Sequence, residues 1–142
     1  MSSASSRPYR TTRRWAATSA MRRLVHRAQR RPARIVFAEG EDERVLRAAQ
    51  AILEETTELP ILIGRPDVIS ARCERMGLTV RPDRDFSIVN PERDHRYRDY
   101  WATYHDIMKR RGVTPDLAKA IMRTNTTAIG AIMVYREEAD SL

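Results

Sequence analysis

The stretch Arg34-Ile-Val-Phe-Ala-Glu-Gly-Glu-Asp-Glu-Arg-Val-Leu-Arg-Ala-Ala49 decides the fold class of this chain of 142 residues. Its first part, 34–38, is short, apolar and rich in β-branched residues, as expected of a buried strand. Glu39-Gly40 then turns the chain. The acids at 41–43 stand in the first turn of a predicted helix, where they match the positive end of the helix dipole. A strand, a tight turn and a helix in this order predict the first half of a βαβ unit.

The same order of strand and helix recurs along the chain. Leu59–Ile63 is a second predicted strand, and Pro66 opens a helix that runs to Gly77. The further predicted elements are a short strand near 78–80, helices over 97–110 and 115–122, and a strand over 128–135, with another apolar run at 86–89. Strands that alternate with helices predict a mainly parallel sheet covered on both faces. The predicted fold class is therefore α/β, with three layers in the order α/β/α.

Ala128–Tyr135 is the longest apolar run of the chain and has the length of a buried strand. No apolar stretch approaches the roughly 18 to 20 residues that cross a bilayer. A buried parallel strand at 128–135 needs neighbours in its sheet. The sequence therefore predicts a truncated sheet, whose exposed strand edges would favour self-association.

Charge is distributed unevenly. Residues 1–34 hold ten arginines and no acid, which leaves 16 of the 26 basic residues to face all 19 acids in the rest of the chain. The net charge of +7 thus comes from the basic arm, and the body is mildly acidic. A basic body would favour nucleic acid as a partner, and a basic arm on a mildly acidic body favours it much less. Nucleic-acid binding through the arm is the lesser alternative.

Residues 1–20 are rich in serine, threonine and arginine, with no apolar period, and we expect a disordered leader there. An arginine-rich, acid-free stretch is also typical of a mitochondrial transit peptide, and a linker or an upstream start would look the same. A short helix is expected over 21–31, and the predicted domain comprises 21–142. We expect a cytoplasmic protein, since the single cysteine makes no intramolecular disulfide.

Three basic side chains are candidate phosphate contacts. Arg65 follows the strand 59–63, and ligands of open α/β sheets bind at the carboxyl ends of strands; the alternative is an arginine that points to water. Lys109 and Arg110 end a predicted helix, where they match the negative end of its dipole or contact the phosphates of a coenzyme.

The turn 39–42 lies where a phosphate-binding loop would sit, but it has one glycine and three acids. It is either a tight turn with acids matched to the dipole or a cleft in which Glu39 or Arg44 orients a ligand. Cys73 is expected to be inert. The three histidines have no metal-binding spacing, so no metal site is predicted, and no catalytic set can be assigned from residue chemistry.

Several stretches together resemble the phosphate acetyl/butyryltransferase family, in the version found as the C-terminal domain of bacterial NADP-dependent malic enzymes. They are Arg34–Ala49, Pro60–Pro66, Val89–Pro91, Tyr97–Tyr100, Arg111–Pro115 and Met122–Met133. The resemblance runs over about 20–142 and identifies the chain as the N-terminal portion of such a domain.

The resemblance implies the isocitrate-dehydrogenase-like α/β/α fold of that family, with coenzyme A held between two subdomains. It implies either an acetyl-CoA-sensing or assembly role within a malic enzyme, or part of a phosphate acetyltransferase that moves acetyl between acetyl phosphate and coenzyme A. The serine and aspartate that assist transfer in the family lie in a later part of the domain. We therefore carry no catalytic residue over, expect the isolated chain to be inactive, and name coenzyme A or acetyl-CoA as its ligand.

Overall fold

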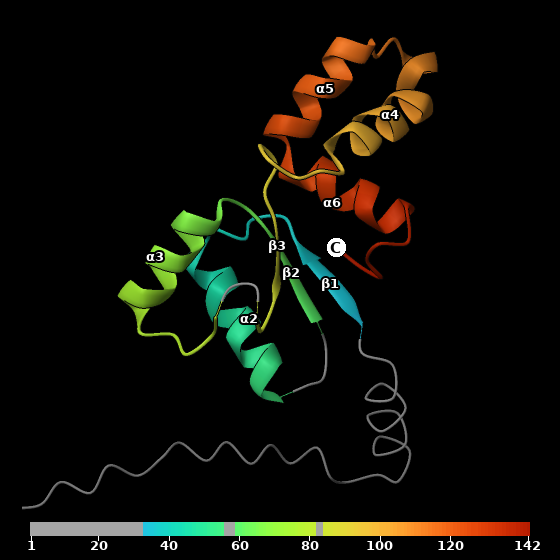
Figure 1. Cartoon of the computed structure of the whole chain (residues 1–142). Coiled ribbons are helices and arrows are strands. Elements are labelled where there is room, and N and C mark those ends of the chain that lie inside the picture. Colours follow the sequence, from blue (N-terminus) through green and yellow to red (C-terminus); the bar gives the residue numbers. More distant parts are fainter. Residues whose placement is uncertain (1–32, 56–58, 82–83) are drawn as a thin grey trace, which may run out of the picture. The chain divides into compact units, whose positions relative to one another are not determined.

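The computed structural model describes residues 33–55, 59–81 and 84–142, all within the compact unit Pro32–Leu142. Its elements are, in order, β1 (Arg34–Phe37), α2 (Glu43–Glu55), β2 (Leu59–Ile63), α3 (Pro66–Met76), β3 (Ser87–Val89), α4 (Tyr97–Met108), the 3₁₀ turn η1 (Lys109–Arg111), α5 (Pro115–Thr124) and α6 (Thr126–Tyr135) (Figure 1). The predicted leader 1–20 and the predicted helix 21–31 lie outside the described residues.

The three strands form one parallel sheet in the order β1-β2-β3. Val36 of β1 pairs with Ile61 of β2, and Ile63 of β2 pairs with Val89 of β3. Strands that run parallel and follow one another need a helix to cross back over the sheet, and α2 and α3 supply those crossovers. The predicted mainly parallel sheet is confirmed.

Alternation along the strands divides the core into two layers, as the period of two in a strand requires. Leu62 of β2 faces α2 and α3, in a cluster with Leu46, Ala49, Ile69, Cys73, Val80 and Phe86. Ile61 and Ile63 face the opposite side, in a cluster with Val36, Val89, Tyr100, Met122, Ile129, Ile132, Met133 and Ala139. Helices α4, α5 and α6 supply that second cluster, so the three-layer α/β/α prediction is also confirmed.

The predicted strand over 128–135 is wrong, because these residues form helix α6. Asn125 caps this helix: its side-chain oxygen accepts the backbone N–H of Ala128 at 2.9 Å. Ile129, Gly130, Ile132 and Met133 are buried on one side of it, while Tyr135 is exposed. The expected exposed strand edge at 128–135 does not exist, so the sequence argument for a truncated sheet loses its basis. Self-association stays a prediction.

The predicted short strand at 78–80 is wrong as well, since these residues pair with no strand, although Val80 is buried. The outer edge of β1 is partly covered by the segment after α6. Ile35 forms a parallel bridge with Ser141, and the N–H of Val36 donates to the Ser141 carbonyl at 2.9 Å. This pairing fastens the chain after α6 to the sheet.

Candidate functional site

A cavity of about 570 Å³ opens at the carboxyl ends of the parallel strands. Open α/β sheets bind ligands at this edge. The lining comes from the turn after β1, the end of β2 and the turn that follows it, helix α3, the segment after β3, the end of α5 and the start of α6. It consists of Ala38, Glu39, Glu41, Asp42, Arg44, Ile63, Gly64, Arg65, Arg72, Pro91, Glu92, Arg123 and Thr126. Four acidic and four basic side chains therefore surround one opening.

Gly40 sets the path of the turn that carries the acids. Its N–H donates to the Ile63 carbonyl at 3.1 Å, which draws the turn against the end of β2. A Cβ at position 40 would lie 2.8 Å from that oxygen and 2.8 Å from the Leu62 Cβ. Only a glycine fits so close to neighbouring backbone, and this approach brings Glu41 to the end of β2.

The Glu41 carboxylate binds Arg65 through three donors. Oε1 accepts the Arg65 backbone N–H and Nε, each at 2.9 Å, and Oε2 accepts Nη2 at 2.9 Å. These hydrogen bonds from Arg65 outweigh the opposing effect of burial and lower the pKa of Glu41 to about 2. The carboxylate is therefore ionised throughout the physiological range.

Other arginines of the cavity are also engaged. Arg44 binds the carboxylate of Asp42 through Nε at 3.1 Å and Nη2 at 3.0 Å, and this contact lowers the pKa of Asp42 to about 2. Arg72 donates to the backbone carbonyl of Glu41. The guanidinium of Arg123 lies over the Tyr97 ring, 4.8 Å from its centroid. The cavity is thus lined by charges that already have partners within the chain.

This arrangement suits binding better than proton transfer. A general acid or base near neutral pH needs a pKa near 7. Glu41 and Asp42 are far below that value. Of the described residues, those that line the cavity include no histidine, cysteine or lysine. Guanidinium groups bind phosphate and carboxylate in a bidentate manner, so the cavity has the donors for an anionic ligand.

The structure places the three predicted phosphate contacts in two regions. Arg65 lines the cavity and binds Glu41, and its side chain is 56% exposed. Lys109 and Arg110 do not line it; both are exposed in η1, where Lys109 pairs with Asp106 at 3.1 Å. Phosphate contacts by all three remain predictions.

Sequence reasoning named Glu39 and Arg44 as alternatives for orienting a ligand, and both line the cavity. It missed Arg72, Arg123 and Thr126. Arg72 lies mid-helix and Arg123 near a helix end, and neither position is next to a strand. Only the tertiary arrangement brings them to the carboxyl edge, so no local signal could have found them.

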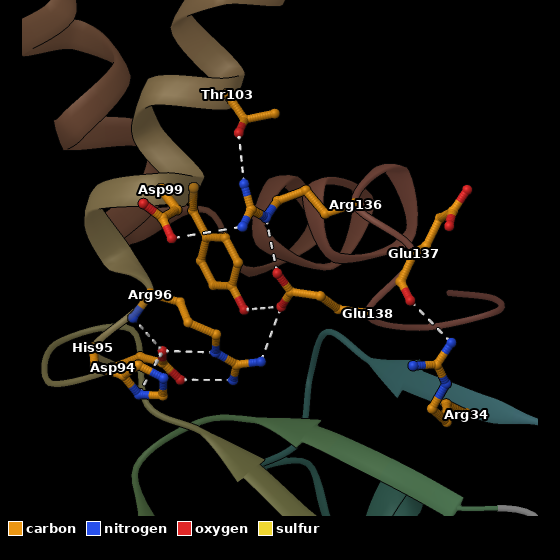
Figure 2. Close-up of polar contacts among 10 residues, drawn as sticks. Arg34, Asp94, His95, Arg96, Asp99, Thr103, Arg136, Glu137 and Glu138 are labelled. Atoms are coloured by element: carbon orange, nitrogen blue, oxygen red, sulfur yellow. Dashed lines mark hydrogen bonds and ion pairs between the residues drawn. The ribbon is translucent and has the colours of Figure 1, made fainter.

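A second charged cluster lies between the N-terminal end of α4 and the segment after α6 (Figure 2). Glu138 is its centre: Oε2 accepts Arg96 Nη1 at 2.9 Å and the Tyr100 hydroxyl at 2.7 Å, while Oε1 accepts Arg136 Nε at 2.8 Å. Arg96 also binds Asp94 through Nε at 3.0 Å and Nη2 at 2.9 Å. The cluster joins residues about 40 positions apart, so it holds α4 against the chain that follows α6.

The pKa values in this cluster follow from burial and from the arginines. Burial raises the pKa of Asp94 and of Glu138, but hydrogen bonds from Arg96 to Asp94, and from Arg136 and Tyr100 to Glu138, outweigh it. Both carboxyl groups therefore have a pKa below the ordinary value. Burial, together with the bond to Glu138, raises the pKa of the Tyr100 hydroxyl, which stays protonated.

Cys73 is buried in the layer of α2 and α3, and burial raises the pKa of its thiol. A buried thiol without a cationic neighbour is a poor nucleophile, in agreement with the prediction from sequence. Among the described ranges, no group of three or more histidine, cysteine, aspartate or glutamate side chains could hold a metal ion. Within the same ranges, no helix is long and apolar enough to cross a membrane.

The parallel sheet, the helices on both of its faces and the polar cavity at the carboxyl ends of its strands define an α/β domain whose candidate ligand site lies at that edge. The profile of the phosphate acetyl/butaryl transferase family matches residues 19–142, and the chain belongs to this family.

Named relatives agree with this assignment. The chain is 62% identical over 109 residues to an NAD-dependent malic enzyme of Rhizobium meliloti, and 48% identical over 122 residues to an NADP-dependent malic enzyme of Salmonella typhimurium. These matches cover 77% and 86% of this chain but 14% and 16% of the relatives, so the chain spans a small part of their length. The solved structure of a phosphotransacetylase from Streptococcus pyogenes superposes with a TM-score of 0.73 at 26% identity, covering 87% of this chain and 37% of that one.

Proposed function

We propose that this chain is a ligand-binding part of a phosphate acetyl/butyryltransferase-like domain that belongs to a malic enzyme, with a role in acetyl-CoA sensing or in assembly. The observation that carries the proposal is the cavity at the carboxyl edge of the sheet, which offers guanidinium groups to an anion. The Glu41 and Asp42 carboxylates of this cavity have a pKa of about 2, which is too low for general acid–base catalysis near neutral pH. In this role the chain binds a ligand and does not itself transfer an acyl group.

The malic enzyme context rests on the identities of 62% and 48% to proteins of that name. The longer protein would convert malate to pyruvate and CO₂. The two relatives are named for different nicotinamide coenzymes, so the choice between NAD and NADP is left to the dehydrogenase part. That part lies outside the region matched here.

Acetyl-CoA suits the cavity because it carries several phosphate charges on a flexible molecule. Arg65 is the proposed phosphate contact within the cavity. Lys109 and Arg110, which are exposed in η1, would reach a phosphate only outside it. Substituting them one at a time therefore tests the assignment of each.

The direct experiment is isothermal titration of the purified full chain with acetyl-CoA. We expect saturable binding that weakens about tenfold in Arg65→Gln, since a lost charge-assisted hydrogen bond costs roughly 1.5 kcal/mol. Arg98→Gln, which removes the same charge from an exposed position of α4 that does not line the cavity, is the matched control. A folded chain that shows no heat of binding at millimolar acetyl-CoA would refute the sensing role.

A second candidate function is supported by the similarity to a phosphotransacetylase at a TM-score of 0.73. In that case the chain would be part of an acetyltransferase that moves acetyl from acetyl phosphate to coenzyme A. Thioester absorbance that rises when the chain is mixed with acetyl phosphate and coenzyme A would favour the transferase over the sensing role. Turnover that falls in Arg65→Gln would favour the transferase.

A further inference from the structure

Glu41 is bound to Arg65 in the way that a ligand anion would be. Three N–H donors of one residue converge on its carboxylate at 2.9 Å, the backbone N–H, Nε and Nη2. Carboxylate and phosphate oxygens accept the same donors with the same geometry. A phosphate that binds Arg65 must therefore compete with the Glu41 carboxylate for these donors.

The Glu41 side chain can take this path because Gly64, which it crosses, has no side chain. A Cβ at position 64 would lie 2.8 Å from the Glu41 Cγ, so the side chain crosses Gly64 to reach Arg65. Arg65 itself stands immediately before α3 with its side chain 56% exposed. The Glu41 side chain is 26% exposed, so water reaches the arginine of this pair more than its carboxylate.

The carboxylate has a second cation nearby to which it can move. Arg72, about two turns further along α3, already donates to the Glu41 backbone carbonyl. Its charge also favours the ionised Glu41 carboxylate. Release from Arg65 would not strand the carboxylate without a partner, which keeps the cost of displacement small for an exposed pair.

We propose that Glu41 is an internal occupant of the Arg65 anion subsite, and that a phosphate group of the ligand binds there by displacing the Glu41 carboxylate towards Arg72. The inference rests on the proposed function, because it assumes that the cavity takes a phosphate-bearing ligand. It adds a regulatory element: the subsite is closed to weak anions and opens to a ligand that gains further contacts elsewhere in the cavity.

Two substitutions of Glu41 separate this mechanism from a general effect of charge. Glu41→Gln keeps the size of the side chain but loses its charge, and we expect acetyl-CoA to bind about three- to tenfold more tightly. Glu41→Asp keeps the charge but withdraws the carboxylate by one methylene, and we expect about two- to fivefold tighter binding. Glu92→Gln removes the same charge from the same cavity, at a side chain that acts on Arg65 through its charge and has no hydrogen bond to it. It should improve binding by less than about twofold.

The experiment is isothermal titration of the full chain and its variants with acetyl-CoA and, in parallel, with inorganic phosphate. A gain for both probes identifies the subsite as one that takes free phosphate as well, and a gain for acetyl-CoA alone identifies a coenzyme phosphate; both support the proposal. The gain should vanish in Glu41→Gln combined with Arg65→Gln. Thermal unfolding of each variant shows that it is folded, and Glu41→Asp provides the test if Glu41→Gln is not.

The outcomes are distinguishable from failure of the proposed function. Wild-type binding with no gain in either Glu41 variant, or with an equal gain in Glu92→Gln, would overturn this inference and leave the proposed function intact. If neither probe binds to the wild type or to any variant, both are refuted together. Binding by the Glu41 variants with undetectable wild-type binding would support the inference, because the internal carboxylate would then be the stronger competitor.

Discussion

The Glu41–Arg65 pair at the cavity and the Arg96–Glu138 pair beneath α4 both have a nitrogen–oxygen distance of 2.9 Å, but water reaches them differently. The Arg65 side chain is 56% exposed, whereas that of Arg96 is 29% exposed. Glu41 binds donors of one residue, whereas Glu138 binds donors from three. Exposed pairs contribute roughly 0 to 1 kcal/mol, and part-buried shared ones cost more to break. Pairs with the same distance therefore have different roles. A ligand can displace the Glu41–Arg65 contact, whereas the Arg96–Glu138 contact stabilises the fold.

Acidification should produce the largest effect. The pKa values of Asp94 and Glu138 lie below their ordinary values of 3.8 and 4.5, and that of Glu41 is about 2. Charged forms with a depressed pKa stabilise the folded state above the ordinary pKa, and this stability is lost as pH falls through the folded-state value. We expect the free energy of unfolding to fall between about pH 5 and 2, as these three carboxyl groups become protonated.

Urea unfolding followed by circular dichroism at pH 6, 4, 3 and 2 measures this loss. Glu138→Gln and Glu41→Gln should each flatten the profile, because each removes a carboxyl group whose pKa is depressed in the folded state. We expect the smaller change in Glu41→Gln, because solvent screens its contact with Arg65, whose side chain is 56% exposed. Stability that rises as pH falls would contradict the comparison of the two pairs.

Glu138→Ala should have the next largest effect. It leaves two arginines and the Tyr100 hydroxyl without their shared acceptor, in a region where water compensates only partly. We expect the free energy of unfolding to fall by about 2 kcal/mol, measured by urea denaturation. Asp99→Ala is the matched control, since Asp99 is 60% exposed and its contact with Arg136 is 3.6 Å long. An equal loss in both variants would show that the cluster is not special.

Tyr100→Phe isolates a single hydrogen bond of the same cluster. The ring, which is 2% exposed, keeps its packing, and only the hydroxyl bonded to Glu138 is removed. The expected loss is about 1 kcal/mol by denaturant unfolding, the net worth of one hydrogen bond. In the Glu138→Ala background the same substitution should cost almost nothing. A loss that persists there would mean that the hydroxyl acts through another partner.

Glu41→Gln should have the smallest effect on stability. Its exposed contact with Arg65 is worth less than about 0.5 kcal/mol of unfolding free energy, and glutamine preserves the acceptor for the Arg65 backbone N–H. Differential scanning fluorimetry should show a melting temperature close to that of the wild type. A strong destabilisation would show that the Glu41–Arg65 pair stabilises the fold as the cluster around Glu138 does.

Most of the sheet could be predicted from the sequence because its strands are short apolar runs next to turn residues. Leu59–Ile63 has the predicted bounds, and Pro66 and Gly77 punctuate α3 as expected. The run 128–135 was misassigned because eight apolar residues fit a buried strand and a buried helix equally well. The deciding signal was Asn125, whose capping bond to Ala128 begins a helix.

The site was only partly predictable. The position of Arg65 at the end of a strand follows from topology alone. Its partner Glu41 is 24 residues away on another turn, and the contact depends on the close approach at Gly40, which no local pattern reveals. Arg72 and Arg123 reach the same cavity from helices, so their participation is a property of the packing. Lys109 and Arg110 had an equally plausible sequence context but do not line the cavity.

Cys73 is the only cysteine of the sequence, and its thiol is 3% exposed between α3 and the sheet. A thiol reagent can reach it only when that layer separates from the strands, so each labelling event records one opening. The rate of labelling would therefore measure how often the core between the sheet and helices α2 and α3 opens, without any added probe. Repeating it with acetyl-CoA present would reveal whether a ligand at the carboxyl edge slows the motion of the helix that begins beside Arg65.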